Sequence, residues 1–141
     1  MKKARISIKG LPVLSDCEED SFELMTDGEY SRKDGISTFS YVESELTGFD
    51  GMQTTFNVEP DRIVLSRDGG LSGDMIFSVK QKHHFLYDTP FGAIMLGIDT
   101  HSIKKSMRDD GGSIEIRYNI EVDNATVSQN LFKIKVKTYP Q

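Results

Sequence analysis

The stretch that decides the fold class is Ser113-Ile114-Glu115-Ile116-Arg117-Tyr118-Asn119-Ile120-Glu121-Val122, in which every second residue is apolar. A period of two places alternate side chains on one face of a β-strand, where they can be buried together. Gly and Asp residues cluster between such stretches, as at residues 33–35, 48–51, 67–70 and 109–112. These residue types accept the backbone dihedrals of tight turns, so the sequence predicts antiparallel β-structure throughout.

The same pattern extends along the whole chain. We expect strands near residues 4–11, 22–33, 36–47, 52–59, 62–67, 74–80, 83–88, 91–108 (broken or bent), 113–123 and 127–138. Residues 11–20 indicate a loop or a short helical turn, and no internal repeat or linker is evident. A meander of this length hides its edges by closing. The sequence therefore predicts an all-β, single-domain antiparallel barrel of eight to ten strands over residues 1–141.

Composition narrows the possible environments and partners. The chain has 17 basic and 22 acidic residues, a net charge of −5 that does not favour a nucleic-acid partner. No run of 18 apolar residues is present to span a membrane, and the alternating charged residues 4–10 do not form a signal peptide. Cys17 is the only cysteine, which excludes an internal disulfide. These features together predict a cytoplasmic protein.

Apolar matching between neighbouring strands predicts the register of the last hairpin. A three-residue loop at residues 124–126 sets Ile114 opposite Val136, whereas a two-residue loop sets Ile114 opposite Lys135. A slip of one residue exchanges the two faces of a strand, so the three-residue loop is favoured. In that register Glu115 faces Lys135 on the outer side.

Two further turns set the registers in the middle of the chain. A two-residue turn at residues 60–61 aligns Val58 with Ile63, and both then face the interior. A four-residue loop at residues 48–51 sets Tyr41 opposite Val58. The interior face of these strands therefore carries polar residues beside the apolar ones.

This inward face contains the candidate site. Glu43, Glu45 and Arg67 share it with Phe56, and Arg67 falls opposite Thr54. Unpaired buried charge is costly, so these groups are expected to pair or to reach water inside the barrel. The candidate ligand-binding residues are Tyr41, Glu43, Glu45, Phe56, Arg67, Met75, Phe77 and Tyr87, with Leu65 and Phe85 completing the apolar lining. Two interpretations stay open: an anchor for a carboxylate or phosphate group, or a structural ion pair.

Several short stretches also resemble a known family. They are Ser40-Tyr41-Val42-Glu43 with Thr47-Gly48, Val64-Leu65-Ser66-Arg67-Asp68-Gly69, Met75-Ile76-Phe77, Tyr87-Asp88-Thr89-Pro90-Phe91-Gly92, and Gly112 with Tyr118. With these stretches the chain, from about Ile6 to Val136, is similar to the YwiB-like family. The resemblance implies a bacterial domain of unknown function with a calycin-like, lipocalin-type β-barrel. It implies no activity and no catalytic residue.

The chain departs from the better-known calycin proteins, which hold apolar or amphipathic molecules. It has no tryptophan, whereas secreted lipocalins carry a Gly-x-Trp motif. Arg117 and Tyr118 are adjacent and point to opposite faces, whereas intracellular fatty-acid binders resemble one another in an Arg-x-Tyr pair on one face. Ligand binding is therefore an analogy from the fold.

Other candidate groups favour structural roles. His83 and His84 are adjacent on a strand and face opposite ways, so we expect one exposed and one partly buried histidine and no metal site. Acidic neighbours raise the pKa of the Cys17 thiol and oppose reactivity. The stripe Lys133, Lys135 and Lys137 is interpreted as a solvated outer face that protects a sheet edge.

The leading hypothesis is a barrel without catalysis or cofactor that binds a small, partly apolar ligand with a polar or anionic end. The alternative is a structural or protein-interaction barrel, in which an edge such as residues 4–11 or 83–88 pairs with a partner or a second copy. An enzyme is a third hypothesis, because no catalytic constellation is evident. The sequence leaves the ligand and the oligomeric state open.

Overall fold

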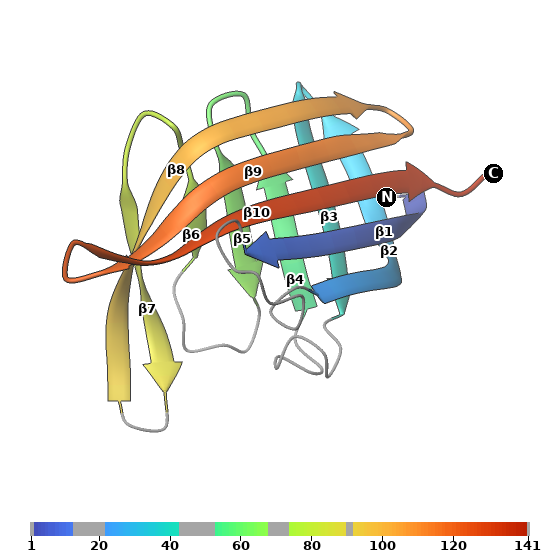
Figure 1. Ribbon diagram of the computed structural model, residues 1–141. Helices are drawn as coiled ribbons and strands as arrows, with labels where there is room; N and C mark the ends of the chain where they lie inside the picture. Colours follow the sequence, from blue (N-terminus) through green and yellow to red (C-terminus); the bar gives the residue numbers. More distant parts are fainter. Residues whose placement is uncertain (1, 13–21, 43–52, 68–73, 90–91, 141) are drawn as a thin grey trace.

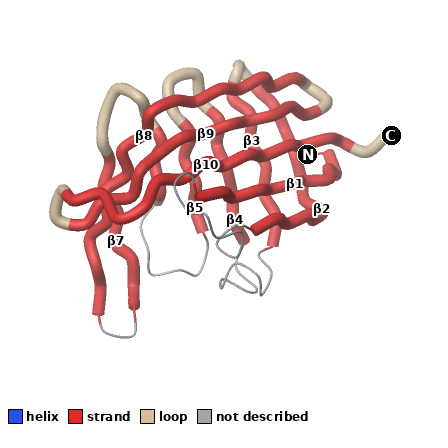
Figure 2. The backbone as a smooth tube through the Cα atoms, viewed as in Figure 1, coloured by secondary structure: helices blue, strands red, loops and turns tan. Residues whose placement is uncertain are grey.

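In the computed structural model of the chain, the described residues form ten antiparallel strands in one sheet (Figures 1 and 2). It describes residues 2–12, 22–42, 53–67, 74–89 and 92–140. The strands are β1 (Lys2–Pro12), β2 (Phe22–Lys33), β3 (Ile36–Val42), β4 (Gln53–Val58), β5 (Ile63–Arg67), β6 (Met75–Phe77), β7 (His83–Thr89), β8 (Gly92–Arg108), β9 (Gly111–Val122) and β10 (Ala125–Thr138).

The sheet closes around the first and last strands. Its order is β6-β5-β4-β3-β2-β1-β10-β9-β8-β7, so β1 pairs with both β2 and β10. The two edges, β6 and β7, follow each other in sequence and lie close together without a hydrogen-bonded ladder. The result is a nearly closed antiparallel barrel, consistent with a calycin-like fold. The predicted all-β class and strand number are therefore confirmed.

Most predicted strands match in position, and the differences are local. β6 covers only three residues of the predicted 74–80 segment, because residues 78–82 form the connection to β7. The predicted bend in the long strand is present as a bulge in β8 between Thr100 and Ser102. The predicted extension of β3 over residues 43–47, and most of the predicted loop over residues 11–20, lie outside the described residues.

The interior is formed by alternate residues of every strand, as the period of two predicts. Its core residues are Ala4, Ile6, Ile8, Leu24, Tyr30, Phe39, Tyr41, Phe56, Val58, Ile63, Leu65, Phe77, Phe85, Ile98, Ile114, Ile116, Ile134 and Val136. The four largest completely enclosed side chains are aromatic: Tyr30, Phe39, Phe56 and Phe77. These rings fill much of the middle of the barrel with the protein's own side chains.

Hydrogen bonds across the barrel fasten one of its ends, here called the first end. The Tyr30 hydroxyl on β2 donates to the Arg108 carbonyl on β8 at 2.5 Å and lies 3.1 Å from Ser37 Oγ. Arg32 of β2 donates to the Met107 carbonyl. Lys105 reaches from β8 to the β4–β5 turn and donates to the Pro60 carbonyl at 3.0 Å. The terminal half of β8 is thus held to β2 and to the β4–β5 turn.

The register of the last hairpin differs from the prediction. Asp123 and Asn124 form a two-residue turn with φ angles of 53° and 65°, the left-handed pair that suits a tight hairpin. A bulge between Thr126 and Ser128 then shifts the register by one residue. Ile114 therefore lies opposite Ile134, and not opposite Val136. The bulge brings the apolar faces of β9 and β10 together. The sequence predicted a three-residue loop in this role.

The two central registers gave opposite outcomes. The β4–β5 turn aligns Val58 with Ile63 as predicted, and the Glu59 amide donates to the Arg62 carbonyl at 2.9 Å. The β3–β4 register was wrong: Tyr41 lies opposite Thr54, four residues away from the predicted Val58. In the same way Phe39, and not Glu43, lies opposite Phe56. Apolar matching misjudged this pair because a shift of four residues leaves each face unchanged.

Gly28 marks a tight approach between strands. A Cβ atom at Gly28 would lie 2.1 Å from the Ser40 carbonyl oxygen of β3 and 2.7 Å from Ile6 Cδ1 of β1. Only a residue without a side chain allows three neighbouring strands to approach so closely. Gly28 therefore permits the curvature that carries the sheet from β1 round to β3.

A partly buried ion pair joins the seam to strand β9. Lys82 lies just before β7, and its Nζ contacts Oε1 of the buried Glu121 of β9 at 2.9 Å. The pKa of Lys82 is raised above 10.5, mainly by its hydrogen bond to Glu121. Desolvation lowers this pKa, whereas the negative charges of Glu121 and Asp99 raise it further. The pair ties the β6–β7 connection to β9, which is separated from β7 by β8.

We predict that Gly28→Ala lowers the free energy of unfolding by about 3 kcal/mol, because the new Cβ atom meets backbone that cannot move independently. The matched control is Gly97→Ala, whose Cβ lies 3.3 Å from the end of the His84 ring and can be accommodated by a small ring movement. Urea denaturation of both variants measures the difference. Equal stability of the two variants would contradict the proposed curvature at Gly28.

We predict that Lys82→Met lowers Tm, because it leaves the buried Glu121 carboxylate without its ammonium partner. The double variant Lys82→Met, Glu121→Gln should recover part of the loss, which thermal denaturation measures. Since the folded pKa of Lys82 is raised, the stabilisation is complete below the unfolded pKa and is lost as pH rises through the folded pKa. A double variant that loses the sum of both single effects would show that the two side chains are not coupled.

Candidate functional site

A polar row crosses the interior at the second end of the barrel, where β3, β5 and β7 end. Tyr41 of β3 lies opposite Thr54 of β4, and Thr54 lies opposite Arg67 of β5. Directly opposite residues share a face, so all three positions belong to the inward face. Tyr41 is 5% exposed and Thr54 is completely buried. The predicted pairing of Arg67 with Thr54 is confirmed, and Tyr41 is the third member of the row.

Aromatic rings form the apolar surface beside this row. The Phe56 ring stacks on Phe39 with centroids 4.9 Å apart and an interplanar angle of 12°. Tyr41 extends the stack, with its centroid 6.4 Å from Phe56. Phe132 of β10 packs edge to face against Phe56, and the two ring centroids are 6.2 Å apart. The stack connects the polar row to the packed middle of the barrel.

The other predicted apolar residues are also on the inward side. Phe77 is completely buried and meets Tyr118 edge to face at 5.0 Å, while Met75 packs against the core at the start of β6. Leu65 and Phe85 are buried in the same core. The structure therefore brings the apolar half of the predicted site together.

The charged half of the predicted site is only partly within the described structure. Glu43 and Glu45 lie outside the described residues, and for Arg67 and Tyr87 the backbone alone is described. The predicted ion pair between Arg67 and a carboxylate therefore stays a prediction. The backbone places Arg67 on β5 and Tyr87 on β7, near the second end.

Thr100 adds a polar group that the sequence pattern did not identify. It lies on β8 opposite Tyr118, next to the bulge, and is 5% exposed. Its Oγ1 atom is buried and has no hydrogen-bond partner among the described residues. Buried hydroxyl groups in native proteins are almost always satisfied, so this atom marks a place where a further polar group fits. An isolated threonine in an alternating strand gives no sequence signal of this kind.

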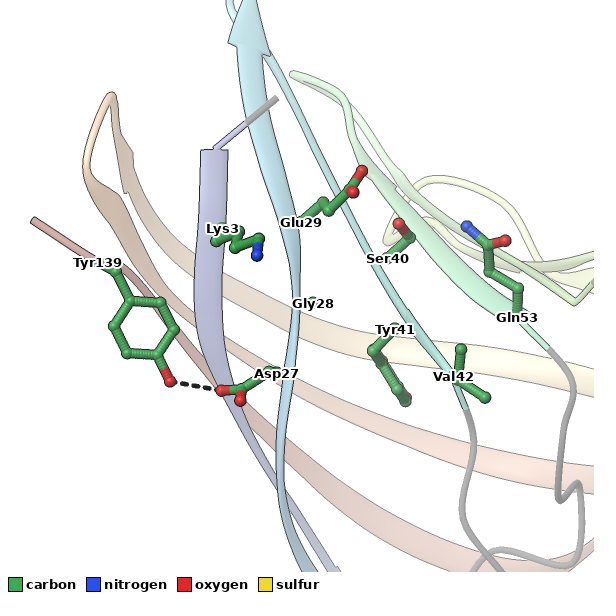
Figure 3. A pocket seen from close by; sticks show the side chains of 9 residues that line it. All are labelled: Lys3, Asp27, Gly28, Glu29, Ser40, Tyr41, Val42, Gln53 and Tyr139. Carbon is green, nitrogen blue, oxygen red and sulfur yellow. Dashed lines mark hydrogen bonds between the residues drawn. The ribbon is translucent and has the colours of Figure 1, made fainter. Parts of the chain in front are cut away.

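A separate groove of about 450 Å³ lies on the outer surface over β1 to β4 (Figure 3). Its lining residues are Lys3, Asp27, Gly28, Glu29, Ser40, Tyr41, Val42, Gln53 and Tyr139. The Tyr139 hydroxyl donates to Asp27 Oδ1 at one side, as the dashed line in Figure 3 indicates. Tyr41 is common to this groove and to the interior row. Charges of both signs line the groove, so its chemistry selects no single ligand class.

The histidine and lysine predictions had different outcomes. His83 is half-buried and His84 is exposed, as predicted from their opposite faces. The edge-protection interpretation of the lysine stripe was wrong, because β10 lies between β1 and β9 inside the sheet. Glu115 lies opposite Lys133, and Ser113 takes the predicted place opposite Lys135. Across the described ranges, no three His, Cys, Asp or Glu side chains are grouped closely enough to hold a metal ion.

The described residues include no helix with the length and hydrophobicity needed to cross a membrane. Among solved structures, the ywiB protein from Bacillus subtilis is similar over 99% of this chain and 93% of its own, with a TM-score of 0.80. The two sequences are 20% identical, so this likeness concerns the fold. No curated protein matches the sequence. The family described as "Domain of unknown function (DUF1934)" matches residues 6–134, and the chain belongs to that family.

Proposed function

We propose that the protein binds a small amphipathic molecule at the second end of the barrel, without catalysing a reaction on it. The observation that carries this proposal is the row Tyr41, Thr54 and Arg67, in register on three neighbouring strands and directly beside the Phe39–Phe56 stack. A polar row next to an apolar surface matches a ligand with one polar and one apolar end. The lone Cys17, which offers no internal disulfide, supports a cytoplasmic setting.

The filled middle of the barrel limits the apolar part of the ligand. Tyr30, Phe39, Phe56 and Phe77 are completely buried, and Tyr30 is fastened to β8 at the first end. A long acyl chain would have to displace these rings, and disrupting a packed core costs several kcal/mol. The geometry therefore favours a short apolar group that enters from the second end, with Leu65 and Met75 beside it.

The polar end of the ligand is proposed to be anionic. Arg67 belongs to the inward face by register, and a guanidinium group binds carboxylate or phosphate with two parallel hydrogen bonds. The buried Thr100 hydroxyl of β8, which has no partner among the described residues, is a further polar group inside the barrel.

The edge strand β7 favours a second candidate function. β7 borders the seam and pairs with β8 alone, so residues 83–88 form the sheet edge that the interaction hypothesis requires. Such an edge accepts a strand from a partner or a second copy. The other predicted edge, residues 4–11, is wrong, because β1 is paired on both sides.

We predict that Arg67→Met keeps the fold and lowers the affinity for a short anionic amphiphile by about tenfold or more, the value of a lost charge-assisted hydrogen bond. Octanoate is the probe, measured by isothermal titration calorimetry. Native mass spectrometry of freshly purified protein tests for a ligand that copurifies. The wild-type protein should carry a small molecule and the Arg67→Met variant should not.

The matched control is Arg62→Met, which removes an exposed arginine beside the β4–β5 turn at the first end of the barrel. This variant should bind octanoate as the wild type does. If neither octanoate nor a copurified molecule is found, the ligand proposal is wrong. A dimer that a proline substitution at Leu86 of β7 abolishes would then support the interaction barrel.

A further inference from the structure

The outer surface of β1, β8 and β10 carries a dense group of positive charges, which we call the basic face. Its members are Arg5, Lys9, Lys104, Lys133, Lys135 and Lys137, all exposed. On β1 and β10 they alternate with the buried Ile6, Ile8, Ile134 and Val136, so they project outward from the barrel. Six of the 17 basic residues therefore lie together on one side of the sheet, although the net charge of the chain is −5.

The registers set like charges directly against each other. Lys9 lies opposite Lys133, and Arg5 lies opposite Lys137, across the β1–β10 ladder. On the other side of β1, Lys9 lies opposite Glu23 and Arg5 lies opposite Asp27. Like charges directly opposite on neighbouring strands destabilise a sheet. Glu115 lies in register between Lys104 and Lys133, yet none of the six basic-face residues has a described acidic partner within 4.0 Å. The acidic residues in register offset this repulsion in part, and an anionic partner would reduce it further along the β1–β10 ladder.

Hydroxyl groups lie between these charges. Ser106, Ser113, Lys135 and Ser7 follow one another in register across β8, β9, β10 and β1. Surface grooves of about 360 and 380 Å³ meet at three of these residues, Ser106, Ser113 and Lys135. Lysine ammonium and serine hydroxyl groups are the donors that commonly contact phosphate oxygens.

We propose that the basic face binds the phosphate backbone of a single-stranded nucleic acid. A single strand supplies regularly repeated negative charges and can follow a curved sheet, whereas a duplex is stiff over about 150 base pairs. The face is curved because β8 contains a bulge and a Cβ at Gly112 would lie 2.1 Å from the Ser106 carbonyl. This proposal is independent of the interior ligand.

The contact is expected to involve phosphates and not bases. The outward residues of the four strands β1, β8, β9 and β10 include no aromatic side chain on which bases could stack, because Tyr118 and Phe132 belong to the interior. An acidic peptide would gain affinity by adding a strand to a free edge. These four strands are each paired on both sides, so the basic face offers no such edge. The geometry thus favours a nucleic acid over an acidic peptide.

The sequence disfavoured a nucleic-acid partner because of the net charge and because the stripe Lys133, Lys135 and Lys137 lacks exposed aromatic neighbours, but it left local basic patches possible. Acidic residues such as Glu23, Asp27 and Glu29 lie outward on β2, beside the basic face. These carboxylates repel a polyanion, so the complex is expected to be weak. The contacts between lysines and phosphates make its affinity strongly dependent on salt concentration. Binding without sequence preference follows from contacts made only to the backbone.

The test is fluorescence anisotropy with a labelled oligothymidine of about 20 nucleotides, titrated with the full chain between about 50 and 200 mM salt. The face variant carries Lys133→Gln, Lys135→Gln and Lys137→Gln. The control variant carries Lys2→Gln, Lys33→Gln and Lys80→Gln, three exposed residues outside the basic face with the same total charge change. Circular dichroism of both variants verifies that the fold is kept.

We expect the face variant to bind the oligothymidine at least about tenfold more weakly at 50 mM salt. Each lysine that contacts a phosphate releases counterions from the nucleic acid, and each lost contact removes that favourable contribution. The slope of log K against log salt should become less steep by about 2, since a single strand contributes about 0.7 per contact. The control variant should match the wild type.

Three results would overturn the proposal. The first is that the wild type does not bind at the lowest salt concentration. The second is that the control variant loses as much affinity as the face variant, which would show that only net charge matters. The third is that poly-glutamate displaces the oligothymidine at equal concentrations of negative charge, which would identify an acidic protein as the partner.

Discussion

The pairing of β1 with β10 is the constraint on which the rest of the structure depends. Without this ladder the ten described strands would form two separate meanders, β1–β6 and β7–β10, each with two free edges. With it, the free edges among the described strands are β6 and β7, which lie close together. The ladder also sets what faces inward, because Ile6 pairs with Val136 and Ile8 with Ile134. The same register that buries these residues places Lys9 beside Lys133 and Arg5 beside Lys137 on the outside. The apolar core and the repulsive outer face are thus two sides of one alignment.

The sequence predicted the fold well because the fold follows from face alternation, which is a local property. Ile114, Ile116 and their neighbours are buried as the period of two requires, and the turn at residues 60–61 gave the correct β4–β5 register. Which residues lie opposite each other on neighbouring strands depends on turn geometry and bulges. The alternation of apolar and polar residues gives no information on either. The Asp123–Asn124 turn and the bulge after it shift the last hairpin while the faces remain the same. For the same reason the four-residue error between β3 and β4 could not be detected from apolar matching.

The site was predictable in part. The inward positions of Tyr41, Phe56 and Phe77 follow from alternation, and the Arg67–Thr54 pairing follows from a tight turn. The features that sequence reasoning missed all join strands that are distant in sequence. Tyr30 reaches Arg108, Lys82 reaches Glu121, and Gly28 allows the close approach of β1 and β3. A residue's own neighbours contain no signal for contacts of this kind. For the lysine stripe of β10, the sequence correctly predicted that the side chains point outward. Its predicted role in protecting a sheet edge was wrong, because β10 lies between β1 and β9.

The position of the seam also has a consequence for the order of folding. Each ladder except one joins strands that are consecutive in sequence, whereas the β1–β10 ladder joins residues as distant as Ala4 and Thr138. Loop-closure entropy has to be overcome before such a distant contact contributes, so hairpins form early and the β1–β10 ladder forms late. Until that last step, the strands form two separate sheets, β1–β6 and β7–β10, and β1 and β10 each have one unpaired edge. Both are rich in lysine, and charge repulsion at these temporary edges keeps nascent chains from joining one another. We therefore expect these positive charges to oppose aggregation during folding, before the barrel closes.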